Sequence, residues 1–364
     1  MLEKIRAATA ANRTFFLGVI FFLFTSFIMG IVLVLFPDMP YMLYMLCLYI
    51  PAIVGLGSVS LFFTVRYGKT LLPENPIRAR QILKMIPLVL CGYLAMLPMN
   101  IISMILNEKI WGSTILESAG SVPIPESGGI LAVSIVIFAL LPAIFEEWLF
   151  RGIVQRANTP NLGKWVPLYT AVAFGLMHGN LITDWSLILI GFLISMVMYQ
   201  TGSLKLCVWY HFLHNTLALS LGFFSNKMQD MLGQTETPQG TILEQVGMGA
   251  VVVWLVIGVG AFCGAWFLLK SMQVYKGTPM DQAKQMKVRN QRPPQWVAPV
   301  LYVSEIEQRP SLTKTQDAQS SDIQQQMGQQ RPFAQVNYVW YILGLALLLA
   351  LALLTAIATK FLPQ

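Results

Sequence analysis

Charged residues are scarce in this sequence. Only 11% of the 364 residues are Asp, Glu, Lys or Arg, whereas 55% are hydrophobic and the mean hydropathy is +0.62. Soluble domains carry about 25% charged residues, so the composition indicates a membrane protein with a lipid bilayer as its surroundings. The net charge is +7, but the basic residues lie mostly in connections between apolar runs. This distribution argues against nucleic acid as a partner.

Cysteine and several common catalytic motifs are also scarce or missing. The four cysteines lie in apolar stretches without CxxC spacing, so neither a disulfide nor a metal framework has support. They are Cys47, Cys91, Cys207 and Cys263. The chain contains no H-E-x-x-H, no G-x-S-x-G and no Gly-Lys-Ser phosphate loop. Serine-hydrolase and P-loop mechanisms therefore lose their support.

Apolar runs long enough for membrane helices are abundant instead, since a span needs about 20 such residues. The fifth and sixth runs are short, which fits tilted or re-entrant helices. The runs cover 14–36, 41–65, 86–106, 130–150, 166–180, 185–201, 204–224, 247–269 and 336–359. We predict an all-α fold, a polytopic transmembrane helical bundle of about eight or nine spans.

A polar stretch separates the last two apolar runs. Residues 271–335 include the segment "IQQQMGQQ" and begin with several basic residues, as expected of a cytoplasmic Gln-rich linker. Residues 1–270 then form a membrane-embedded core, and residues 336–364 add a C-terminal transmembrane anchor. Basic residues alternate with acidic ones from one connection to the next, which predicts a cytoplasmic N-terminus.

Two adjacent glutamates interrupt the fourth apolar run. Glu146 and Glu147, in "AIFEEWLFRG", are the only acidic residues within the candidate spans, and carboxylates at such depth are functional candidates. Arg151 follows Glu147 by four residues, a favourable helical pairing, while Glu146 points about 100° away and stays free. Pro142 removes a helix hydrogen bond nearby. The alternative is a helix end near Phe145 with an interfacial turn.

All three histidines of the chain follow these glutamates. His178 lies in "FGLMHGN", and His211 and His214 lie in "WYHFLHN", where His211 and Asn215 share a helix face. Such a set can hydrolyse an amide: a glutamate takes a proton from water, and a neutral histidine positions that water or binds Zn²⁺. A second histidine and an Asn amide stabilise the oxyanion.

The three motifs together resemble a known family. "EEWLFR" fits E-E-x-x-x-R, "FGLMH" fits F-x-x-x-H, and "HFLHN" fits H-x-x-x-N. Their order and spacing are similar to the CAAX protease and bacteriocin-processing (Abi) family of intramembrane proteases, over about residues 130–225. The resemblance implies a polar cavity open to the cytoplasmic side, in a protein of the bacterial plasma membrane. It also implies an endopeptidase for a prenylated or otherwise lipid-anchored tail, a bacteriocin leader or a membrane-bound regulator.

The resemblance also implies roles for the motif residues. Glu146 is the expected water-activating base and Glu147 its partner, and Arg151 orients both glutamates.

His178 is expected to join in binding water or metal, and His211 with Asn215 completes the site. Zn²⁺ held by Glu146, His178 and His211 is chemically reasonable, and so is a glutamate-activated water alone. His214 falls outside the motif and is expected to be a packing residue or to support the other site residues.

Two other classes of protein stay open. One is a non-catalytic immunity or scaffold protein that recruits a partner through residues 271–335, and the other is a proton-coupled transporter. No candidate catalytic residue lies beyond Asn215, so we expect the last span to be dispensable for chemistry.

The charge pattern predicts that tags at residues 115 and 300 lie on opposite sides of the membrane. Protease protection in sealed vesicles should cleave one tag and spare the other. Equal protection of both tags would contradict the topology.

Overall fold

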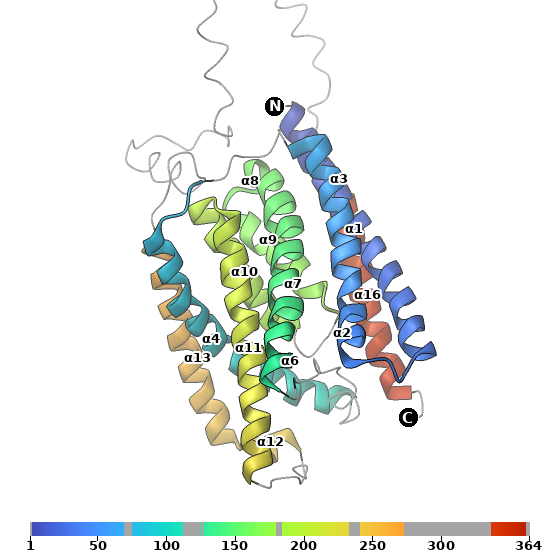
Figure 1. Ribbon diagram of the computed structural model, residues 1–364. Coiled ribbons are helices and arrows are strands. Elements are labelled where there is room, and N and C mark those ends of the chain that lie inside the picture. The colour runs from blue at the N-terminus through green and yellow to red at the C-terminus, as the bar shows by residue number, and fades with distance from the viewer. Residues whose placement is uncertain are drawn as a thin grey trace, which may run out of the picture.

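The chain forms a bundle of long helices. The computed structural model describes residues 2–68, 75–111, 125, 127–179, 184–232, 241–272 and 336–361. Within these ranges every regular element is helical and there is no strand. Figure 1 shows a central group, labelled α6 to α11, with α4 and α13 on one flank and α1, α2, α3 and α16 on the other. The predicted all-α fold is confirmed.

The first flank contains the chain's two ends. Helix α1 (Leu2–Leu35) packs against the run formed by α2 (Tyr41–Ile50), the π-helical η1 (Pro51–Leu56) and α3 (Gly57–Tyr67), and also against α16 (Val339–Phe361). The approach to η1 is close, because a Cβ at Gly55 would lie 2.8 Å from the Phe22 Cα. Glycine therefore brings the two backbones together beside what proves to be the site.

The second flank consists mainly of α4 (Ala79–Trp111) and α13 (Met248–Lys270), with the short α12 (Ile242–Val246) between α11 and α13. A buried apolar cluster joins this flank to α10 and α11 through Leu88, Leu193, Tyr210 and Ala265. The Lys84 Nζ donates to the Ser271 carbonyl oxygen at 2.7 Å. The basic start of α4 thus lies beside the end of α13.

The glutamates lie in a continuous helical run at the centre. It consists of α6 (Gly128–Ser134), η3 (Ile135–Leu140), α7 (Leu141–Glu147), η4 (Trp148–Gln155) and α8 (Arg156–Leu162), of which η3 and η4 are π-helical. The predicted span 130–150 therefore ends too early, and the helix-end alternative for the two glutamates is wrong. Arg151, just beyond the predicted end of that span, is 0% exposed inside the bundle.

The next two helices are short, as predicted. After the 3₁₀ turn η5 (Gly163–Trp165), α9 (Val166–Leu176) has 11 residues, or about 17 Å of length, against a hydrocarbon core of about 30 Å. The turn after α9 includes Gly179 at φ 63°. The chain then continues into α10 (Asp184–Thr201) and α11 (Leu204–Leu232). Because α9 is short, the turn that follows it, with His178, stays inside the bundle.

The apolar runs predicted from the sequence coincide with these helices. Five helical stretches are long and apolar enough to cross a membrane: 6–35, 41–67, 79–110, 128–176 and 248–270. Two shorter apolar helices, at 185–201 and 339–355, accompany them. The chain is therefore an integral membrane protein, whereas the number of spans and the sidedness stay predictions. The predicted linker falls almost entirely on residues 273–335, outside the described residues.

Candidate active site

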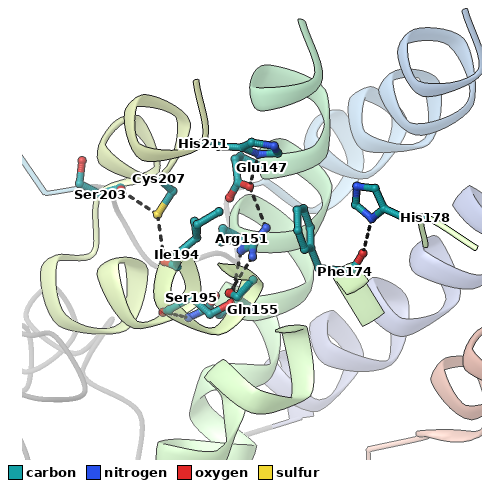
Figure 2. A network of polar contacts seen from close by, with 11 residues as sticks. Glu147, Arg151, Gln155, Phe174, His178, Ile194, Ser195, Ser203, Cys207 and His211 are labelled. Carbon is teal, nitrogen blue, oxygen red and sulfur yellow. Dashed lines mark hydrogen bonds and ion pairs between the residues drawn. The ribbon is translucent and has the colours of Figure 1, made fainter. Parts of the chain in front are cut away.

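A buried ion pair forms the centre of the site. The Arg151 Nη1–H donates to the Glu147 Oε1 at 2.7 Å, and both side chains are 0% exposed. Figure 2 shows the pair between the helices that carry the histidines. The predicted pairing of Glu147 with Arg151, four residues apart, is confirmed. Burial removes water from both charges, so each depends on the other for compensation.

The guanidinium of Arg151 is held on every side. Its Nε–H donates to the Ser195 Oγ at 3.3 Å and its Nη2–H to the Gly191 carbonyl oxygen at 2.8 Å. The Phe174 ring lies beneath it, 4.4 Å from ring centroid to guanidinium carbon. Helix α10 thus supplies two partners that the motifs do not contain. Their only signal in the sequence is that Gly191 and Ser195, four residues apart, share a helix face.

Glu147 also fixes His211. The His211 Nδ1 lies 2.9 Å from the Glu147 Oε1. The carboxylate oxygen that pairs with Arg151 accepts, so the His211 Nδ1 carries the hydrogen. The Nε2 of a neutral His211 is then left with a lone pair, on a side chain that lines the pocket described below. The carboxylate therefore sets both the ring's orientation and its tautomer.

His178 is anchored in the same way, by its own helix. Its Nδ1 lies 3.0 Å from the Phe174 carbonyl oxygen, which can only accept, so Nδ1–H donates and Nε2 is left free. The Phe174 ring meets the His178 ring edge-on at 5.1 Å and the His211 ring at 5.6 Å between centroids. Phe174 thus touches both histidines and Arg151, and it spaces them (Figure 2).

A pocket of about 480 Å³ lies beside this cluster. Glu146 lines it, and within the described part of the chain its buried Oε2 has no hydrogen-bond partner. The rest of the wall is largely apolar, with residues such as Leu48, Leu56, Met177 and Leu219. The Glu147 Oε2 is likewise without a partner among the described residues, but Glu146 is the glutamate that lines the cavity.

Asn215 lies on the pocket wall and contacts the bend before the glutamates. Its Nδ2–H donates to the Phe138 carbonyl oxygen at 3.4 Å. That oxygen is four residues before Pro142, which has no N–H to offer it. The amide retains a second hydrogen for another acceptor. Pro142 thus affects the site through Phe138 and the π-helical segment η3 that ends beside it.

His214 belongs to the same pocket, which the motif did not indicate. It is 5% exposed, and its ring centroid lies 5.7 Å from that of Tyr93. Its Nδ1 has no partner among the described residues. The three histidines and Asn215 therefore share one cavity with Glu146.

The donors of the predicted zinc site fit such a metal in their chemistry. His178 and His211 both donate Nδ1–H to an oxygen, which is how histidine ligands are usually held, and Glu146 adds a carboxylate. Their placement fits less well. No group of three His, Cys, Asp or Glu side chains in the described ranges is arranged to hold a metal.

A family comparison agrees with this geometry. Residues 128–217 match the family model of the type II CAAX prenyl endopeptidase Rce1-like proteins. This segment resembles the Rce1-like family. The match extends from the start of α6 into α11 and includes all seven motif residues, so the family resemblance is confirmed. It supports CAAX-type intramembrane protease activity in general. Comparisons with curated proteins and with solved structures give no significant match.

The buried ion pair makes the fold sensitive to Glu147. Glu147→Gln leaves the Arg151 cation uncompensated, so the Rce1-like core should lose on the order of 3 kcal/mol of stability, and activity with it. Thermal unfolding in detergent measures the loss. The control is Asp230→Asn, whose carboxylate is 72% exposed and 3.9 Å from Lys227. Equal unfolding temperatures for both variants would contradict the importance of the pair.

Proposed function

We propose that the protein is an intramembrane endopeptidase that cuts a peptide bond near the cytoplasmic membrane face, with Glu146 as the general base. The observation that carries the proposal is the division of labour between the adjacent glutamates. The Glu147 Oε1 is held by both Arg151 and His211, and Glu147 does not line the pocket. Glu146 lines the pocket, and no such ion pair holds its carboxylate among the described residues. A general base needs a free lone pair within reach of water.

The chemistry follows from the groups around the pocket. Glu146 takes a proton from a water whose oxygen attacks the scissile carbonyl carbon. The carbonyl oxygen becomes negative and accepts the second amide hydrogen of Asn215. The C–N bond then breaks, and the leaving amine takes the proton held by Glu146. One water is consumed, and a carboxylate and an amine are released.

The histidines hold the water and the substrate in this scheme. The free Nε2 of His178 accepts a hydrogen from the attacking water and orients it. The Nε2 of a neutral His211 accepts a hydrogen bond, whereas the Nε2–H of a protonated His211 donates one. His211 can therefore assist the oxyanion in the step where negative charge develops.

The apolar wall indicates the class of substrate. Leu48, Leu56 and Leu219 line the same cavity as Glu146, which suits a peptide carrying a lipid chain rather than a fully polar one. The substrate we propose is a prenylated or otherwise lipid-anchored tail, in line with the CAAX-type family match. A bacteriocin leader or a membrane-bound regulator is the alternative substrate.

Two assays separate the rival functions. A scaffold or immunity protein would cleave nothing and would lose its partner when residues 271–335 are shortened. A proton-coupled transporter would acidify the interior of sealed vesicles or take up a solute into them. The pairing of the Glu147 Oε1 with both Arg151 and His211 disfavours a proton relay through that oxygen.

Glu146→Gln should abolish cleavage while leaving the fold intact. The amide keeps the shape of the side chain but cannot accept a proton, so the cleavage rate should fall by about 10²-fold or more. The measurement is hydrolysis of a panel of farnesylated and unmodified CAAX peptides in detergent, with thermal unfolding in parallel. Full cleavage by a folded Glu146→Gln variant would refute the assignment.

Metal removal tests the zinc alternative. Bound Zn²⁺ would polarise the scissile carbonyl and activate water, with Glu146, His178 and His211 as its ligands. If Glu146 acts on water without a metal, cleavage should survive dialysis against a strong chelator. Loss of activity that returns with Zn²⁺, and not with Mg²⁺, would favour the metal mechanism.

A further inference from the structure

The C-terminal helix α16 is joined to the beginning of the chain by polar contacts. The Asn12 Nδ2–H donates to the Asn337 carbonyl oxygen at 3.3 Å, and the Asn337 N–H donates to the Thr9 Oγ1 at 3.1 Å. The Asn12 Oδ1 in turn accepts from the Asn158 Nδ2–H and from the Tyr169 hydroxyl, both at 2.9 Å. Buried Asn12 therefore links α16 to α8 and α9.

Packing then presses α16 against α9. The Tyr341 ring stacks on the Tyr169 ring with 3.7 Å between centroids and 17° between planes. The Tyr341 hydroxyl donates to the Tyr169 carbonyl oxygen, and the side chain is 5% exposed. Gly344 brings α16 close to α1, since a Cβ there would lie 2.7 Å from the Phe15 ring. Helix α16 is therefore packed against α1 and α9 by specific contacts.

The docked surface reaches the wall of the pocket. Tyr341 and Leu348 belong to one buried apolar cluster with Phe174 and Met177, and the latter two line the pocket. Phe174 follows Tyr169 by five residues on α9, and its ring contacts both Arg151 and His178. The short α9 ends inside the bundle, so its lateral contacts must fix its position.

We propose that α16 is a positioning element of the active site, in which Tyr341 holds α9 so that Phe174 and His178 stay in place. The inference rests on the proposed protease function, and it reaches beyond the Rce1-like segment, which ends at residue 217. It also replaces the expectation that the last span is dispensable for chemistry. Tyr341 acts through α9 and touches no reacting atom.

Substitutions at Tyr341 in the full-length protein test the proposal. Tyr341→Ala removes the ring stack and should lower kcat for a cleaved CAAX peptide by about tenfold or more, because small misplacements of catalytic groups are costly. KM should change by less than about twofold, since substrate contacts are unaltered. Tyr341→Phe keeps the stack and loses only the hydroxyl, so it should retain most of the rate.

The matched control is Ile342→Ala, the next residue in α16, whose side chain is 60% exposed. It should cleave at the wild-type rate. Wild-type kcat in a folded Tyr341→Ala variant would overturn the proposal. If that variant does not fold, Tyr341→Leu, which also removes the ring stack, is measured instead, and a wild-type kcat in folded Tyr341→Leu would overturn the proposal. Failure of the wild type to cleave any peptide would refute the protease function, not the docking.

Discussion

The rest of the site depends on the charge of Arg151 being compensated inside the bundle. A buried guanidinium needs a carboxylate and further acceptors, and Glu147, Ser195 and Gly191 supply them. Once Glu147 is committed in this way, it orients His211, and the neighbouring Glu146 is left to face the pocket. Two adjacent residues of one type therefore have different environments, and in the proposed mechanism one holds the structure while the other reacts with water.

Local helix geometry makes this separation attainable. The π-helical segments η3 and η4 flank the short helix α7, which carries both glutamates. Such π-helical segments are frequent at functional sites. Pro142 lies at the junction of η3 and α7, where its missing N–H is tolerated. Asn215, from α11, bonds to the carbonyl oxygen of Phe138 in η3. The bend before the glutamates is thus tied to the helix that carries His211.

The sequence predicted much of this and missed a definable part. The apolar runs located the helices because lipid burial demands long hydrophobic stretches, and i, i+4 spacing predicted the Glu147–Arg151 pair. The partners from α10 could not be predicted, because one backbone carbonyl and one serine leave no charge or motif in the sequence. The docking of α16 was missed for a similar reason, because it depends on Asn12 and Tyr341, which are more than 300 residues apart. By itself the apolar run 336–359 predicts only a membrane anchor. The end of the predicted span 130–150 was wrong because a basic residue after an apolar run, here Arg151, resembles a connection charge.

A double-mutant cycle on Glu147 and Arg151 tests the central claim most directly. Thermal unfolding would be measured for Glu147→Gln, Arg151→Met and the double variant, each purified in the same detergent. If the pair organises the site, either single change leaves a buried charged group without its partner. The loss of unfolding free energy in the double variant should then be smaller than the sum of the two single losses by about 1 kcal/mol or more. Strictly additive losses, with no recovery in the double variant, would contradict the account.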